Sequence, residues 1–177
     1  MSRWDKGYRN FDSLDEMRET ILTNLNKVVG PDDYFIFGGD GVFGMDKPDT
    51  FRKFWERVIC KNIIYIQGNH DDWFYKKGNL VEVERLVGKV STECYIDIEG
   101  EKYNISHYAP EDECRKIKRE PDTIYLYGHY HNTLKDDGFG MDVGVDTSWN
   151  GHKPFTPYSF PEIMEIMKSR GFQKPKE

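Results

Sequence analysis

The sequence contains little cysteine, no membrane-length apolar run and no excess of basic residues, and each absence narrows what the protein can be. Three cysteines in 177 residues, none in a Cys-x-x-Cys pair, argue against a disulfide framework or a zinc ribbon. A cytoplasmic location is therefore expected. Apolar runs such as 63–66 are far shorter than the ~20 residues of a membrane helix. The polar start Met-Ser-Arg-Trp-Asp-Lys does not resemble a signal peptide, so no membrane contact is expected.

The balance of charged residues limits the kinds of partner that are expected. Lys and Arg number 25 against 31 Asp and Glu, which gives a formal net charge of -6. An extended nucleic acid requires a basic surface, so the balance favours a small or locally bound substrate. Hydrophobic residues make up 37% and aromatic residues 15% of the chain, enough for a sizeable core. Residues 1–177 are of a length that suits one domain.

Hydrophobic periodicity alternates between helix and strand, which predicts an α/β protein. Ser13 and Glu16 have the spacing of a capping box at the start of the first helix. A strand, a helix and a second strand occupy residues 34–66, and this order implies a parallel crossover. The predicted helices are 13–29, 50–60, 80–87, 111–119 and 161–170, and the predicted strands are 34–37, 63–66, 93–98, 102–106, 124–127 and 141–145.

Polar side chains recur where four of these strands end. Four of the five histidines lie in these places. Open α/β sheets bind ligands at the carboxyl ends of their strands, so the groups are expected to meet. Carboxylate, amide and imidazole ligands together suit Mn, Fe or Zn without any thiolate. The groups are Gly39-Asp40, Gly68-Asn69-His70-Asp71, Ser106-His107 and Gly128-His129-Tyr130-His131.

These blocks, in this order, resemble the calcineurin-like metallophosphoesterase superfamily, and are most similar to small stand-alone phosphoesterases of phages and bacteria. The resemblance runs from about Phe11 to the C-terminus. It implies a four-layer α/β/β/α sandwich of two mixed sheets flanked by helices. It also implies hydrolysis of phosphomonoesters or phosphodiesters, small or nucleotide, by hydroxide held at two divalent ions. The expected ions are Mn, or else Fe, Zn or Ni.

The resemblance also implies roles for individual residues. His70 would protonate the departing alkoxide, a task suited to an imidazole near its usual pKa. Asp71 has two interpretations, because it could orient His70 or simply cap the turn. As metal ligands, Asp40 would bridge the two ions, Asn69, His107 and His129 would complete the shell of one, and His131 would serve the other.

One departure from the family pattern affects the second ion. The pattern opens with Asp-x-His after a first central strand, and this sequence contains neither, so it looks N-terminally truncated. The second ion keeps only Asp40 and His131 and should bind weakly, so one ion is an alternative to two. Asp5 is a further candidate ligand. The chain could instead be a degenerate relative that acts as a binding or assembly protein.

The missing strand also affects the expected partners, and an aromatic cluster bears on the substrate. Its absence should expose a sheet edge, which a second copy or another partner would cover. Trp73 and its two aromatic neighbours have two interpretations, either stacking on a nucleobase or packing in the core.

Overall fold

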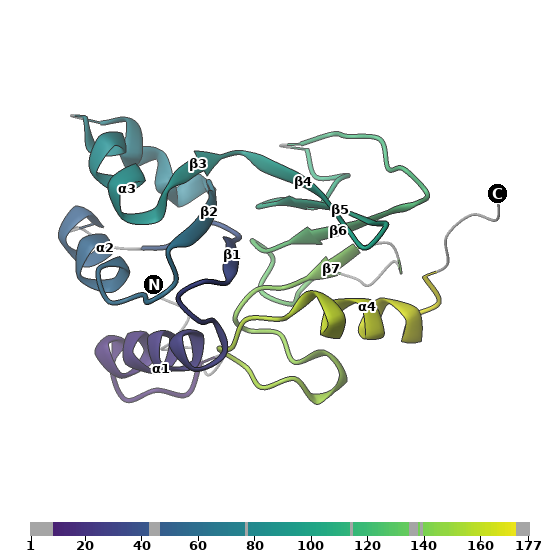
Figure 1. The fold of residues 1–177 in the computed structure, drawn as a ribbon, viewed down its shortest axis with the longest axis horizontal. Helices are drawn as coiled ribbons and strands as arrows, with labels where there is room; N and C mark the ends of the chain where they lie inside the picture. The colour runs from purple at the N-terminus through teal and green to yellow at the C-terminus, as the bar shows by residue number, and fades with distance from the viewer. Residues whose placement is uncertain are drawn as a thin grey trace.

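Two β-sheets form the centre of the protein, and helices flank them (Figure 1). The computed structural model describes residues 9–42, 47–76, 78–113, 115–134, 138 and 140–172. The three-stranded sheet, in the order β1-β2-β3, is parallel, and the four-stranded sheet, in the order β4-β5-β6-β7, is mixed because β4 and β5 are antiparallel. This confirms the predicted α/β architecture of two sheets flanked by helices. The strands are β1 Tyr34–Phe37, β2 Asn62–Ile66, β3 Lys89–Ser91, β4 Glu93–Ile98, β5 Glu101–Ser106, β6 Thr123–Tyr127 and β7 Gly140–Asp142.

The first two helices differ in how well they were predicted. Helix α1, Leu14–Val28, begins after Ser13, whose hydroxyl accepts a hydrogen bond from the Glu16 N–H as expected. Helix α2, Lys47–Trp55, ends five residues before the predicted end at residue 60. The reason is tertiary: the Asn26 side chain bonds the Arg57 carbonyl at 2.9 Å and the Ile59 N–H at 3.1 Å. These bonds satisfy backbone groups that a longer helix would otherwise have paired.

An aromatic core lies between the three-stranded sheet and helices α1, α2 and α3, the last of which spans Asn79–Val87. Trp73 and Phe74 belong to this core, with ring centroids 5.4 and 5.5 Å from that of Phe51. They lie on a 3-10 helix, η2 Asn69–Tyr75. Packing is therefore the confirmed interpretation for these two rings.

A second core lies between the four-stranded sheet and helix α4, Phe160–Ser169.

Two predicted elements in this half of the chain differ from the structure. Strand β7 ends at Asp142, three residues before the predicted end. The predicted helix at 111–119 is wrong, since none of the described residues there is helical. Lys116 has a φ of 50°, and the buried Arg115 guanidinium bonds the Tyr108 carbonyl and Glu93 on β4, so tertiary contacts override local helix propensity.

The carboxyl ends of β1, β2, β5 and β6 meet where the two sheets adjoin. His107, directly after β5, has Nδ1 2.7 Å from the carbonyl oxygen of Gly38, directly after β1. The Gly128 N–H, after β6, donates to the His107 carbonyl at 3.2 Å. The predicted meeting of strand ends is therefore observed.

Two further expectations concern the chain as a whole. Cys60 and Cys94 are free, while Cys114 lies outside the described residues, as does Asp5. In the described part of the chain, no helix combines the length and the apolar character needed to cross a membrane.

Candidate metal centre

Three predicted ligands come together at these strand ends. One ligand atom from each of Asp40, His107 and His129 lies within 4.8 Å of the other two. Asp40 follows β1, His107 follows β5 and His129 follows β6, so the group joins both sheets. His107 is buried, whereas Asp40 and His129 are only partly so. A buried imidazole with two more accessible partners can form a cradle for an ion that enters from solvent.

The surroundings of His107 fit a cation. Its Nδ1 must carry a proton to bond the Gly38 carbonyl, which leaves Nε2 of the neutral ring with a lone pair. That Nε2 lies 3.3 Å from Oδ2 of Asp40, 3.1 Å from Oδ1 of Asn69 and 3.2 Å from Nδ1 of His129. Four possible ligand atoms thus face one another, and a proton on Nδ1 of His129, an added proton on His107 or a metal ion would relieve the repulsion among them.

The pKa shifts reflect the same crowding. Burial opposes ionisation of Asp40, but its hydrogen bond and attraction to His107 lower the pKa of that carboxyl. Burial likewise opposes the charged form of His107, yet Asp40 raises the pKa of that imidazole. Burial and the neighbouring His107 charge lower the pKa of His129. Without a metal, the site therefore attracts a proton to His107, in the place where a cation would be stabilised.

Two glycines allow the loops to approach this closely. A Cβ on Gly39, whose φ is 98°, would lie 2.7 Å from the Gly68 nitrogen and 2.8 Å from Nδ1 of His107. A Cβ on Gly68 would lie 2.1 Å from Oδ1 of Asp40. Side chains at either position would push the ligands apart, so both glycines are needed for the geometry of the site.

Three of the predicted ligands have a strained backbone. Asp40, His129 and His131 have φ values of 58°, 62° and 51°, in the left-handed region that disfavours residues with a Cβ. Such residues cost on the order of 1–3 kcal/mol each and cluster at functional sites. The surrounding structure therefore holds these side chains in positions that the backbone alone would not adopt.

Asp71 is fully buried and binds the backbone of the site. Its Oδ2 accepts the N–H groups of Asp40 and Gly68, both at 2.9 Å, and the Tyr65 hydroxyl at 3.1 Å. Burial raises the pKa of Asp71, although the two backbone hydrogen bonds oppose the rise. Of its two interpretations, the turn cap describes these contacts. His70 is exposed beside the site, and its N–H donates to Oδ1 of Asp40 at 2.8 Å.

His131 stands at the edge of the three-residue group. Its Nδ1 lies 2.6 Å from Oδ2 of Asp146, and the same carboxylate binds Arg9. An electrostatic contribution of His131, smaller than those of burial and His107, also lowers the pKa of His129. Asp146 and Arg9 were not among the predicted site residues. The strand predicted to end at residue 145 could have indicated Asp146, because it repeats the pattern of a strand followed by a ligand-type residue.

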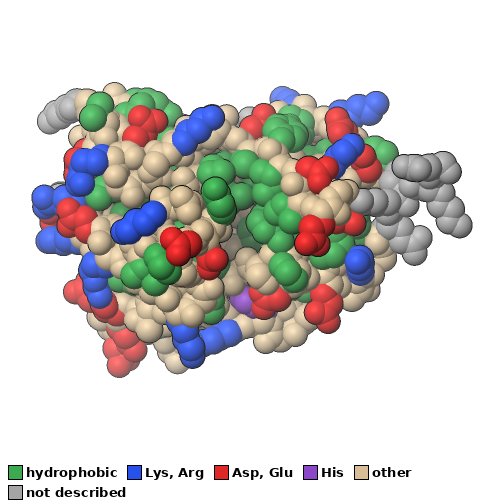
Figure 2. All heavy atoms as spheres, in the orientation of Figure 1, with side chains coloured by type: hydrophobic (Ala, Val, Ile, Leu, Met, Phe, Trp, Pro, Cys, Tyr) green, Lys and Arg blue, Asp and Glu red, His purple; other side chains and the backbone are tan. Residues whose placement is uncertain are grey.

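The molecular surface is hollowed near the centre of the face in Figure 2, where hydrophobic side chains surround the depression. A histidine and acidic side chains reach the surface at its lower edge in this view. Histidine and acidic side chains are therefore accessible from solvent on this face.

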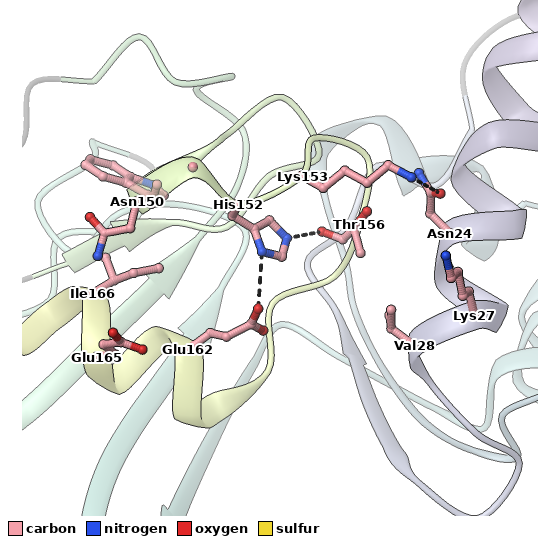
Figure 3. A pocket seen from close by; sticks show the side chains of 12 residues that line it. Asn24, Lys27, Val28, Asn150, His152, Lys153, Thr156, Glu162, Glu165 and Ile166 are labelled. Carbon is pink, nitrogen blue, oxygen red and sulfur yellow. Dashed lines mark hydrogen bonds and ion pairs between the residues drawn. The ribbon is translucent and has the colours of Figure 1, made fainter.

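A separate pocket of about 500 Å³ lies between helix α1, the segment after β7 and helix α4 (Figure 3). Its polar groups pair with one another: Nδ1 of His152 lies 3.5 Å from Glu162, and Lys153 donates to Asn24 at 3.0 Å. None of the predicted ligands lines it. The candidate chemistry is therefore at the strand ends and not in this pocket.

Fold and site together define the chain as an α/β protein of two sheets with a metal-ligand cluster at their joined carboxyl edge. The family model for calcineurin-like phosphoesterases matches residues 7–98, just over half of the chain. The protein therefore belongs to the calcineurin-like phosphoesterase family. The match includes Asp40 and residues 69–71 but ends before His107, His129 and His131, of which the fold brings His107 and His129 to Asp40.

Two further comparisons show similarity in sequence and in fold. An uncharacterized protein of Methanocaldococcus jannaschii is 34% identical over 74 residues, which cover 42% of this chain and 41% of that protein. A crystal structure of a protein of unknown function from Aquifex aeolicus has a similar fold, with a TM-score of 0.60 and 22% identity. The structural similarity covers 87% of each chain.

Proposed function

We propose that the protein is a metal-dependent hydrolase of small phosphomonoesters or phosphodiesters, with Mn²⁺ as the first metal to test. The observation that carries the proposal is the convergence of three electron-rich groups on Nε2 of His107. Carboxylate, amide and imidazole are ligands that suit Mn, Fe and Zn, and the membership of the family supports the reaction class.

The proposed holding residues for a first ion are Asp40, Asn69, His107 and His129. A bound divalent cation would polarise a phosphoryl oxygen and lower the pKa of a coordinated water. Asp40 supplies the negative charge, while the neutral Asn69 and imidazole groups leave the site electrophilic. The Gly38 carbonyl fixes the ring of His107 by binding Nδ1.

A second ion would depend on Asp40 and His131. The contacts of Asp40 support a bridging role, since Oδ2 faces His107 while Oδ1 accepts the His70 N–H. With two ligands in the described part of the chain, this ion is expected to bind more weakly than the first. The two sites therefore predict two separable affinities for Mn²⁺.

His70 is the proposed general acid. It lies exposed at the start of η2, and the hydrogen bond from its N–H to Asp40 fixes its backbone beside the ligands. In this position it can hold a proton for the departing oxygen of a phosphoester. Asp71 would support this role indirectly, because it binds the backbone N–H groups of Asp40 and Gly68 on either side of the site.

The test combines metal stoichiometry with turnover of an aryl phosphodiester such as bis(4-nitrophenyl) phosphate. We expect Mn²⁺-dependent hydrolysis that His107→Ala abolishes and His70→Ala slows without preventing Mn²⁺ binding. His152→Ala is the matched control, because this histidine pairs with Glu162 away from the ligand cluster. Mn²⁺ binding without turnover of monoester or diester substrates would favour the alternative of a binding or assembly protein. Lack of Mn²⁺ binding would reject the metal centre.

A further inference from the structure

Asp146 joins two cationic side chains that are far apart in the sequence. Arg9 donates Nε to Oδ1 at 2.5 Å and Nη2 to Oδ2 at 2.7 Å, a two-pronged contact. Nδ1 of His131 lies 2.6 Å from the same Oδ2. The side chains of Arg9 and Asp146 are only 14% and 9% exposed, so solvent screens this cluster weakly.

The carboxylate is kept ionised by its partners. The guanidinium of Arg9, which is always charged, binds both carboxylate oxygens and so favours the ionised form of Asp146. An ionised carboxylate can only accept hydrogen bonds, so Nδ1 of His131 must carry a proton at the contact. Nε2 is then the ring nitrogen left to bind a ligand once the ring is neutral.

Asp142, the last residue of β7, also holds the backbone of the loop that contains His131. Asp142, at the end of β7, accepts the Asn132 N–H at 2.9 Å, and Asn132 follows His131 directly with a φ of 60°. Asp142 thus constrains the main chain and Asp146 constrains the ring. A loop with consecutive left-handed residues needs such support to keep one conformation.

We infer that Asp146 is a positioning residue that fixes the proton of His131 on Nδ1 and leaves Nε2 for a divalent cation, with Arg9 holding the carboxylate in place. This inference rests on the proposed metal centre and extends it to two residues outside the ligand set. Carboxylate partners of this kind typically change metal affinity by about 10–100-fold. The consequence is that the second ion depends on a contact with the N-terminal segment.

The first test requires no mutation at Asp146. Nitrogen-15 NMR of the metal-free wild-type protein reports which ring nitrogen is protonated, and His131→Ala identifies the signals of His131. We expect protonated Nδ1 in His131. An unprotonated Nδ1 would overturn the inference, whatever the metal affinity.

The second test is a double-mutant cycle on Mn²⁺ affinity, measured by calorimetry with wild type, Asp146→Asn, His131→Ala and the double variant. We expect Asp146→Asn to weaken the weaker Mn²⁺ site by about 10–100-fold alone and to have no further effect when His131 is absent. An equal loss in both backgrounds would show a general structural role and overturn the inference. Asp33→Asn is the control, since Asp33 caps the Gly30 N–H away from the site.

The outcomes separate the two proposals. If wild type and Asp146→Asn bind Mn²⁺ with equal stoichiometry and affinity, the positioning role fails and the metal centre stands. If the wild-type protein binds no Mn²⁺ at all, the metal centre fails and the positioning role with it.

Discussion

A Cβ on Gly68 would lie only 2.1 Å from Oδ1 of Asp40, so these two residues approach more closely than any other amino acid at position 68 would allow. The contact brings the end of β2 against the end of β1. Asp71 reinforces it, because its carboxylate accepts the N–H groups of both residues. The position of Asp40 therefore depends on a neighbouring loop as well as on its own strand.

Gly68→Ala should displace Asp40 and weaken Mn²⁺ binding at least tenfold, with a loss of about 1–3 kcal/mol in the free energy of unfolding from overpacking. Gly38→Ala is the matched control. A Cβ there meets nothing within 4 Å, and its φ is not in the positive range. Calorimetry with Mn²⁺ and urea unfolding compare the two variants. Equal Mn²⁺ affinity in both would contradict the role assigned to Gly68.

Local sequence patterns predicted the strand ends well but not the contacts between them. Asp40, His107 and His129 were predicted because each lies within three residues of the end of a strand, and the order of strands brought them together. The turn cap of Asp71 on Gly68 is local and was one of its two interpretations, whereas its hydrogen bond from the Asp40 N–H was not predicted, since it joins residues 31 apart in sequence.

The wrong and missing predictions also result from contacts between residues far apart in the sequence. The helix predicted at 111–119 gave way to contacts of Arg115 with β4, and the contact between Arg9 and Asp146 was missed because the two residues are 137 apart in sequence. Strand β3 has only three residues, Lys89–Ser91, too short for a periodic signal. Tertiary contacts of this range are not encoded in any local window.

Mn²⁺ affinity should fall as the pH is lowered, because a metal ligand must be deprotonated. Asp40 raises the pKa of His107 above its ordinary 6.5, although burial opposes the rise, so protons compete with the metal from a pH above that value downward. The lowered pKa of His129 means that this ring takes up its proton at a lower pH than His107 does. Each pH unit below the pKa of His107 should cost up to about tenfold in affinity for one displaced proton.

Calorimetry at about pH 6 and pH 8, in buffers of different ionisation enthalpy, would measure both the affinity and the protons released. His107→Gln, which lacks the titrating ring, should bind Mn²⁺ more weakly and with less dependence on pH. An affinity that stays constant over this range in the wild type would show that His107 does not carry the competing proton.

Mn²⁺ should raise the melting temperature of the wild-type protein, because a ligand that binds only the folded state stabilises it. At a free concentration of about 100 times Kd the gain is about 2.7 kcal/mol. For a chain of this size that gain corresponds to about 5–10 °C. Thermal unfolding with Mn²⁺ or with EDTA measures the difference. His107→Ala should show no shift, and a shift of the wild-type size in that variant would place the ion elsewhere.

Tyr65→Phe should lower the free energy of unfolding, although it keeps the apolar packing of the ring. The buried Tyr65 hydroxyl accepts the Gly41 N–H at 2.8 Å and donates to Asp71 at 3.1 Å. Phenylalanine keeps the ring but leaves the Gly41 N–H unpaired, which costs about 1–3 kcal/mol. Asp71 retains two backbone donors, so we expect the fold and Mn²⁺ binding to persist with lower stability.

Tyr75→Phe is the matched control for this change. Tyr75 is 59% exposed, and its hydroxyl donates to Gln67 at the surface, where water can replace the lost partner. Its free energy of unfolding should therefore change by no more than about 0.5 kcal/mol in urea. The same small effect in Tyr65→Phe would mean that the link between β2 and the loop of Asp40 does not depend on the buried hydroxyl. A large effect confined to Tyr65 would show that this hydroxyl couples the strand to the backbone beside the metal ligands.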